Sequence, residues 1–519
     1  METELKRDQI SLWTEVGQES TQLLLEGDVV VPDSKPDVEQ ILYTAGAVRW
    51  DNPTASEGKV RLKGNLDTKI LYRTKKSSWP VAVMESSLPI EETIYMDGVT
   101  SSSRIHLESV LEHLESEWIN DRKVGLRAVV AVEVTAEERK ETDVMEGSED
   151  DGIVWQKVEI VLEKRSDGTE KEDRFTVEDT LVLPQMKPNV GEILMSEGTI
   201  SDLEVRPGEN KITVRGNLKT EILYQPEEEN SMPESVTFRL PFHGVTEMDG
   251  VTGQSQVETD ASLDSLTVEA EMDETGALRN IHIKGQVGLD FTVHDEETRV
   301  VVEDGYDPKR ESENEKTTLT YYRTPSVCTG EEVHRGTLTL PQDVPAVLQV
   351  QAFFAEAVLQ EARAEEGKII LEGRIKYFLL YLCENDAEPI ASYTSEFPFT
   401  QVLLCREAKE GDRVHAHLIT EDAQIQMMSD REGEMSVTVG AQAAISRMEE
   451  TEVLSNMTLG EESIRMPAAA VIYVVKEGDS LWSIGKKFGL SLETILEYND
   501  IQTPDMIYPG EKILLFRSR

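Results

Sequence analysis

The 519-residue sequence predicts a mainly β protein, with three tandem antiparallel β-sandwich or open-barrel repeats followed by a small βααβ domain. Three observations support this class. One segment recurs at a nearly constant spacing, each copy contains a strand with two-residue alternation, and the C-terminal segment follows a strand, helix, helix, strand pattern. A chain of this length exceeds what a single hydrophobic core holds, so several domains are expected.

The repeated segment is defined by motifs that recur in the same order. An offset of 152 residues relates Pro32 to Pro184 and persists through Gly-Asn-Leu, Ile-Leu-Tyr and Met-Asp-Gly-Val-Thr motifs in both copies. A third copy follows 157 residues later, at Pro341, and has lost the Lys-Pro and Met-Asp-Gly-Val-Thr signatures. We therefore expect three copies of one β unit, with a different surface role for the third. The expected ranges are 21–137, 174–297 and 333–447.

Each copy has one strongly alternating strand, expected at 60–72, 212–224 and 369–381. In the first two copies the intervening residues are polar, as in a sheet that keeps one face in water. In the third copy Ile370, Phe378 and Leu380 break the alternation, which predicts that part of this strand is covered on both faces. A glycine recurs in the middle of each strand and indicates a bulge, a bend or the close approach of another backbone.

Acidic, loop-like stretches are expected to separate the units, at 135–151, 304–316 and 448–470. The last is predicted to be a flexible linker, because it has few apolar residues and a composition suited to a spacer. The Pro-x-x-x-Pro segments need fixed, extended geometry. We interpret their prolines as structural, with a partner-docking loop as the alternative.

The charge balance limits the classes of partner. The sequence has 52 Lys and Arg against 100 Asp and Glu, which gives a formal net charge of −48. Such a surface repels nucleic acid and anionic lipid and favours basic partners or cations, although a solvated acidic surface is the commoner explanation. The N-terminal residues lack the features of a secretory signal, and no apolar run is long enough to span a bilayer. We expect a cytosolic protein.

Residues with catalytic or metal-binding chemistry do not form a recognisable set. The three cysteines, Cys328, Cys383 and Cys405, have no CxxC spacing, which argues against a disulfide framework and a zinc site. His415 and His417 share a strand face, but the sequence offers no third metal ligand. Carboxylate pairs carry no catalytic information in so acidic a chain. We predict a protein without enzyme activity and without a cofactor.

The C-terminal segment 471–519 has the pattern of a strand, two helices and a second strand. A turn at Gly478 follows the first strand, and Asp479 or Ser480 caps the first helix. Ser491 caps the second helix, and a Pro-Gly pair turns the chain into the last strand.

This segment resembles the LysM family, through Tyr-x-Val-x-x-Gly-Asp-Ser-Leu from Tyr473 to Leu481 and Ile-x-Pro-Gly from Ile507. The resemblance implies a βααβ fold and a shallow groove for N-acetylglucosamine-containing glycans between the loops 478–482 and 499–507. Leu481 is expected to be core. The candidate binding residues, for protein or glycan, are Gly478, Asp479, Ser480, Leu481, Trp482, Asn499, Ile501, Pro504, Asp505, Met506 and Ile507.

Trp482 is the most informative of these candidates. Its neighbours Leu481 and Ile484 already supply the buried stripe of the helix, which leaves the indole free to anchor a sugar or a protein. The alternative is that the indole packs against the tail of the chain.

The three repeats with their Pro-x-x-x-Pro, Gly-Asn-Leu and Ile-Leu-Tyr motifs, followed by one LysM-like segment, resemble the SPOCS-domain family of clostridial spore-coat morphogenetic proteins. That resemblance implies a scaffold made in the mother cell, which binds a SpoIVA-like coat basement-layer protein, in part through LysM, together with other coat proteins. It implies a location at the forespore surface and a role in coat encasement. The alternative is a protein that binds peptidoglycan through LysM.

Overall fold

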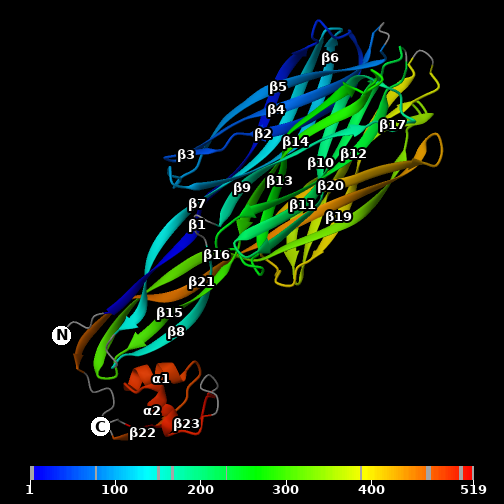
Figure 1. Ribbon diagram of the computed structural model, residues 1–519. Helices are drawn as coiled ribbons and strands as arrows, with labels where there is room; N and C mark the ends of the chain where they lie inside the picture. Colours follow the sequence, from blue (N-terminus) through cyan, green and yellow to red (C-terminus); the bar gives the residue numbers. More distant parts are fainter. Residues whose placement is uncertain are drawn as a thin grey trace.

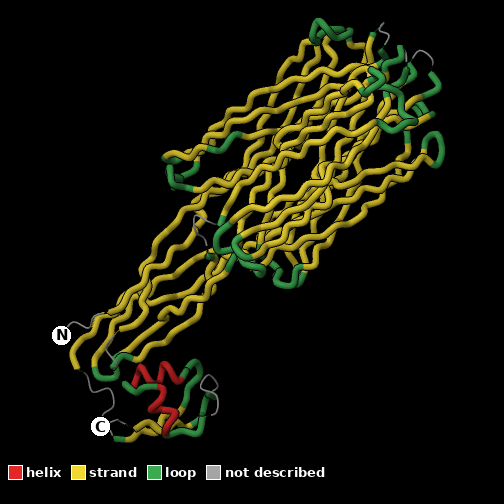
Figure 2. Tube along the Cα trace, in the orientation of Figure 1, coloured by secondary structure: helices red, strands yellow, loops and turns green. Residues whose placement is uncertain are grey.

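The computed structural model describes residues 5–75, 79–148, 152–164, 169–229, 231–385, 388–462, 469–501 and 507–516. The molecule has a broad body of long strands, a narrower β stalk and a small helical domain at the end of the stalk (Figures 1 and 2). The predicted mainly β class is confirmed, and each sheet of the described residues is antiparallel.

Each repeat forms a sandwich of two sheets, and the central strand of each sheet lies between two neighbours. In the first repeat the sheet order is β2-β4-β5, with the short β3 beside β4, and β1-β7-β6. These strands are β1 (Leu5–Val30), β2 (Val38–Trp50), β3 (Thr54–Ser56), β4 (Lys59–Thr74), β5 (Val81–Tyr95), β6 (Arg104–Asn120) and β7 (Lys123–Ser148).

The second and third repeats keep this topology, as β10-β11-β12 with β9-β14-β13, and as β17-β18-β19 with β16-β21-β20. The second repeat has β9 (Glu170–Val182), β10 (Val190–Gly208), β11 (Lys211–Pro226), β12 (Glu234–Glu247), β13 (Val257–Met272) and β14 (Leu278–Val293). The third has β16 (Arg310–Thr339), β17 (Gln349–Glu365), β18 (Lys368–Leu382), β19 (Ile390–Leu404), β20 (Arg413–Met427) and β21 (Glu432–Glu462).

The alternating strands are β4, β11 and β18, and their predicted inward residues are buried inside the three sandwiches. Part of β18, the alternating strand of the third copy, was predicted to be covered on both faces. This is confirmed, because Ile370, Phe378 and Leu380 are also buried. Leu71 and Leu223, at the position of Leu380 in the first two copies, are buried too, which the polar alternation there did not predict.

These outward leucines explain how the three repeats join. Leu71, Leu223 and Leu380 belong to one hydrophobic cluster that takes residues from all three repeats. Around it β5 contacts β10, β12 contacts β17, and β19 contacts β2. The three sandwiches therefore close into a ring around a pseudo-threefold axis.

The mid-strand glycines Gly64, Gly216 and Gly373 are all buried. A Cβ atom would collide with the main-chain oxygen of Arg49 at the first position and of Val358 at the third, and with the ring of Phe242 at the second. Of the three alternatives, the close approach of another backbone is confirmed at Gly64 and Gly373, and a bulge in the partner strand is confirmed opposite Gly216 and Gly373. Glycine suits these positions because a side chain would push its neighbours away.

The acidic stretches at 135–151 and 304–316 are not loops over most of their length. β7 and β16 continue through them, and with β8 (Val154–Glu163) and β15 (Glu296–Tyr306) they form the stalk from three two-stranded ribbons, β1-β7, β8-β15 and β16-β21. Apolar residues between the acidic ones build a shared core. Its members are Ile10, Leu12, Val144, Ile160, Leu162, Val301, Leu319, Tyr321 and Val453.

The flexible linker expected at 448–470 is corrected in the same way. β21 continues to Glu462 in register with β16, and Val453 and Leu454 are fully buried in the stalk. The apolar residues of this segment are few but face inward, which is sufficient for a two-stranded ribbon packed against two others. Residues 463–468, also within the expected linker, lie outside the described part of the chain.

The Pro-x-x-x-Pro loops are held by the same two side chains in each repeat. Tyr72, Tyr224 and Tyr381 donate hydroxyl hydrogen bonds of 2.9, 3.0 and 2.8 Å to the carbonyl oxygen of the second proline. An arginine donates to carbonyls of the same loop in every copy, as Arg122, Arg279 or Arg431. These contacts support the structural interpretation of the prolines. They also explain why a tyrosine recurs at this position in all three repeats, since its role is to hold the loop and needs no binding partner.

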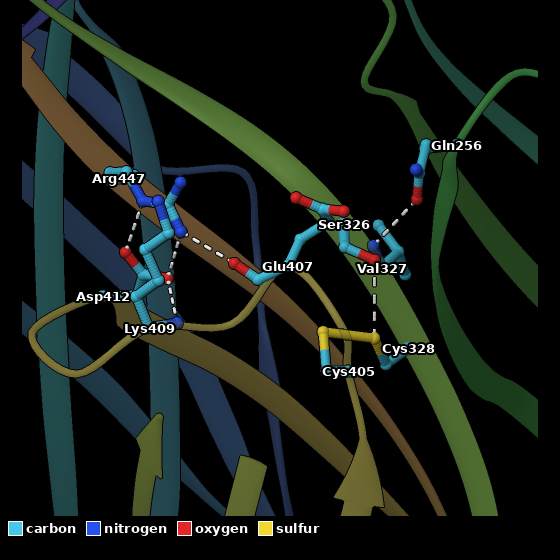
Figure 3. Close-up of a disulfide and its surroundings, with 9 residues drawn as sticks. All are labelled: Gln256, Ser326, Val327, Cys328, Cys405, Glu407, Lys409, Asp412 and Arg447. Carbon is cyan, nitrogen blue, oxygen red and sulfur yellow. Dashed lines mark hydrogen bonds and ion pairs between the residues drawn. A yellow bond between two sulfur atoms is a disulfide. The ribbon is translucent and has the colours of Figure 1, made fainter. Parts of the chain in front are cut away.

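Cys328 and Cys405 form a disulfide in the third repeat, with 5.9 Å between their Cα atoms (Figure 3). The sequence analysis argued against a disulfide from the missing CxxC spacing and so did not predict this pair. The two cysteines come together only because β16 and the end of β19 meet in the fold. Cys405 occupies the position of the buried Met96 and Met248, and its amide makes the equivalent turn hydrogen bond to Gly367. The third repeat therefore replaces a buried methionine of the lost motif by a cross-link. Cys383 is buried, as expected.

Candidate functional site

The C-terminal domain contains β22 (Ala470–Val474), α1 (Leu481–Phe488), α2 (Leu492–Glu497) and β23 (Lys512–Phe516), and β22 pairs with β23. The predicted βααβ fold is confirmed. Ser480 caps α1 in a capping box with Ser483, Gly489 ends this helix in a left-handed conformation (φ 64°), and Ser491 caps α2. The domain has its own hydrophobic core, which includes Leu481.

Asp479 stabilises the turn rather than capping the helix. Its carboxylate accepts hydrogen bonds of 2.8 Å from the Lys476 amide and from the Tyr473 hydroxyl. These two donors hold the pKa of Asp479 below its usual value. Gly478, beside it, is exposed and has φ 84°, a backbone conformation that favours glycine.

The second candidate loop begins with a structural residue. Asn499 donates to the carbonyls of Ile495 and Leu514 and accepts from the Leu514 amide, each at 2.7 Å, so its side chain joins α2 to β23. Ile501 and Ile507 pack against the domain core, to which Leu481 also belongs. The structure thus brings both loops onto one core, with Ser480 and Gly478 exposed at the surface. Pro504, Asp505 and Met506 lie outside the described residues.

Trp482 is not a free surface residue. Its Nε1 donates a 2.9 Å hydrogen bond to Asp304 Oδ2, and its ring meets Tyr306 edge-on, with 4.9 Å between ring centres. Both partners lie at the end of β15 in the stalk. The expectation of an exposed indole is corrected, because the indole packs on the stalk. The alternative was packing against the tail of the chain, and residues 517–519 lie outside the described part.

Two further contacts complete this joint between the LysM-like domain and the stalk. Lys486 Nζ lies 2.7 Å from both carboxylate oxygens of Asp304, and the Tyr306 hydroxyl donates a 2.6 Å hydrogen bond to the Leu490 carbonyl. Tyr306 is fully buried and Asp304 is 8% exposed. A Cβ on Gly485 would collide with the Tyr306 hydroxyl, so α1 approaches the stalk closely.

The joint residues on β15 were missed from the sequence because they fall in a stretch expected to be a linker. Burial alone would raise the pKa of Asp304, but hydrogen bonds from Lys486, Trp482 and Asn314 hold it below its usual value. The available signal was the aromatic Tyr306 within an otherwise acidic, polar run.

Histidines and carboxylates meet where the repeats join the stalk, yet no group of three or more metal-ligating side chains in the described residues has the geometry of a metal site. His415 Nδ1 lies 3.3 Å from Glu108. His294 lies between Glu163 and Glu258, each at 2.8 Å. Among the described residues, no helix combines the length and apolarity needed to cross a membrane.

Comparison with known families agrees with this architecture. The family model "SipL, SPOCS domain" matches three times, at 37–119, 189–271 and 346–428, once in each sandwich. The chain therefore contains three SPOCS domains. The family model "LysM domain" matches 473–516, so the chain also carries a C-terminal LysM domain.

Two curated relatives each match a short stretch of the chain. The chain is 44% identical over 43 residues to "Spore coat assembly protein ExsA" of Bacillus cereus, and equally identical over 43 residues to "SpoIVD-associated factor A" of Bacillus subtilis (strain 168). Each match covers 8% of this chain, and 7% and 11% of the two relatives, so the chain spans only a small part of their length. No solved structure matches the chain.

Proposed function

We propose that this protein is a non-enzymatic scaffold of spore-coat assembly. In this proposal the LysM domain docks a coat basement-layer protein of the SpoIVA type, and the three SPOCS sandwiches contact other coat proteins while the coat encases the forespore. The protein would act in the mother cell, at the forespore surface.

The observation that carries the proposal is the combination of three SPOCS domains with a LysM domain, in a chain that has a short match to a protein named for spore coat assembly. The arrangement of the molecule suits it. The LysM domain lies at the end of a stalk, well separated from the sandwich body (Figure 1). A scaffold with binding surfaces at its two ends can hold two partners at a fixed distance.

Apart from Trp482, the described residues of the two groove loops take no part in the joint with the stalk. The joint with the stalk uses Trp482, Lys486 and Leu490, whereas Glu477 and Asp500, which flank the two loops, are exposed. We therefore assign the partner surface to the loop side of the domain and not to the indole.

The test is retention of a SpoIVA-type protein by the full chain, by a chain without 471–519, and by the double variant Glu477→Arg/Asp500→Arg. Deletion should remove most of the binding, and the double charge reversal should weaken it at least tenfold. Glu493→Arg, an equally exposed charge reversal on α2, is the control and should bind normally. Undiminished retention after deletion would refute a docking role for LysM.

Binding of peptidoglycan is the second candidate, because LysM domains as a family bind such glycans in the same groove. It predicts that the full chain sediments with purified peptidoglycan, and that trimming the glycan abolishes sedimentation. Glycan binding that competes with the coat partner would place both on the one groove. Coat-partner binding without sedimentation would exclude the glycan function.

A further inference from the structure

The strand β22 forms an open edge of the LysM domain. Its only strand partner among the described residues is β23. Helix α1 contacts the stalk, and β22 lies on the far side of the domain (Figure 1). The sequence of β22, Ala-Val-Ile-Tyr-Val, contains no charge, proline or glycine, in a chain in which 29% of the residues are charged. Exposed edges usually carry charges, proline or bulges that prevent pairing with other chains. β22 has none of these, so its edge is suited to receive another strand.

The hydrogen bonds of β23 show where the main-chain groups of β22 point. Leu514 lies directly opposite Ile472, and its amide and carbonyl both bond the side chain of Asn499 on the other side of β23. Opposite residues of an antiparallel pair either bond each other or both point outward. The amide and carbonyl of Ile472 therefore point to the open edge, as do those of Ala470 and Val474 by alternation. No backbone hydrogen bond of a described residue crosses that edge.

The side chains beside this edge are apolar and exposed. Ile472 is 63% exposed, Val474 is 48% exposed, and Leu514, which lies next to Ile472 on β23, is 40% exposed. Val471 and Tyr473 point to the opposite face of the sheet, where they pack against the domain core. β22 thus combines outward-pointing main-chain groups with a small apolar face.

The distribution of charge indicates what meets this edge. The segment 471–519 has six Lys and Arg against seven Asp and Glu, a net charge of −1, whereas the whole chain carries −48. Mutual repulsion between two copies therefore comes almost entirely from their bodies and stalks. Contact through β22 keeps the two bodies far apart, because each lies at the other end of its stalk (Figure 1). At physiological ionic strength, charges separated by more than about 8 Å are largely screened. The LysM end is thus where two copies approach each other with the least repulsion.

We propose that β22 pairs with β22 of a second copy, antiparallel and around a twofold axis at Ile472. In this register Ile472 faces Ile472 of the partner subunit, and Ala470 faces Val474 of the partner subunit. The outward-pointing amides and carbonyls then bond one another, and two sheets of two strands become one sheet of four. The same residues serve both copies, as a twofold interface requires. This self-association goes beyond the proposed function, because it involves no coat protein.

Sedimentation velocity of the full chain alone, over a range of concentrations, tests the proposal. We expect the mass of one chain at low concentration and of two chains at high concentration. Amide hydrogen exchange in peptides that contain 470–474 should slow as the dimer forms. Ile472→Lys should weaken the dimer about tenfold or more, because two lysines would meet at the axis. Ile472→Pro should also weaken it, because proline removes the outward amide hydrogen and leaves the hydrogen bonds to β23 in place.

Leu514→Lys is the matched control. Leu514 lies on the same apolar face as Ile472 but on β23, so this change leaves the open edge intact. The variant should form the dimer as the natural protein does. Circular dichroism verifies that each variant is folded, and Ile472→Lys decides the matter if the proline variant is not.

A chain that remains a monomer at every concentration would overturn the proposal. A dimer that Ile472→Lys leaves unchanged would overturn it as well, since the contact would then lie elsewhere. Equal weakening by Leu514→Lys and Ile472→Lys would indicate packing between sheet faces in place of strand pairing. Because the chain is measured alone, none of these results depends on whether the LysM domain binds a coat protein.

Discussion

At the residue scale, His294 is a buried histidine that lies between two carboxylates at the boundary of body and stalk. Its side chain is 5% exposed, that of Glu163 is 3% exposed, and that of Glu258 is 21% exposed. Burial would lower the pKa of His294, but the hydrogen bonds and charges of the two glutamates raise it to about 9. His415 and His417 face Glu258 from β20 and Thr324 faces Glu163 from β16.

The raised pKa predicts how stability depends on pH. Because the folded pKa of about 9 exceeds the unfolded value of 6.5, the contribution is fully present below pH 6.5 and is lost as the pH rises to about 9. The loss is on the order of 3 kcal/mol by linkage. Urea unfolding between pH 6 and 9.5 should show this decline in the natural protein and a much flatter profile in His294→Gln. The control His113→Gln alters an exposed histidine and should keep the decline.

How far single residues could be predicted depended on whether their role is local. Ser480 and Ser491 cap helices three residues ahead of their donors, and the sequence pattern suffices to place them. Trp482 was misplaced because its environment is set by Asp304 and Tyr306, which lie far away in the chain. Cys328 and Cys405 are a similar case, since 77 residues separate them.

At the element scale, the stalk gives the LysM domain a fixed seat that a flexible linker would not. Tyr306 contributes both a hydrogen bond to Leu490 and a ring contact to Trp482; Tyr306 and Leu490 are buried and Trp482 is half-buried. Among the described residues, the LysM core contains none from the stalk. The contact with the stalk can therefore be removed without unfolding the LysM domain.

Tyr306→Ala should release the LysM domain from the stalk. Small-angle scattering is expected to report a larger and more variable maximum dimension, whereas circular dichroism should report unchanged secondary structure. Tyr95→Ala, at a tyrosine that is 78% exposed in the body, is the control and should scatter like the natural protein. A scattering profile of Tyr306→Ala identical to that of the control would contradict the role of Tyr306 in fixing the LysM domain on the stalk.

The strands of the sandwiches were predictable and the stalk was not, for a physical reason. β4 and β11 alternate over most of their length because one side of each faces a sandwich core and much of the other faces water or partners. In the stalk each ribbon supplies only a few inward residues, such as Val144 and Val453, among many acidic ones. Such a sparse apolar pattern becomes a core only when three ribbons assemble, which a single segment does not reveal.

At the scale of the whole molecule, three copies of one unit behave as a covalent trimer. The repeat spacing predicted the copies, but not that they close into a ring, because the contacts between them use the faces that look polar within one copy. The inner edge strands, β2, β6, β10, β13, β17 and β20, would be open to pairing with other chains if exposed. Closure of the ring covers them, and side chains such as Lys69 and Lys376 bond their free carbonyls.

The ring predicts that the three sandwiches unfold together. Leu71, Leu223 and Leu380 are each fully buried in the cluster on the axis, so replacing any one by alanine should cost about 2–5 kcal/mol. Because the cluster is shared, each substitution should lower the melting temperature of the entire body in calorimetry, with one transition for all three repeats. Leu404→Ala, at a leucine that is 85% exposed, should have almost no effect. If instead Leu71→Ala split off a separate low-temperature transition, the repeats would be independent domains, and the axis would not be the structural centre of the molecule.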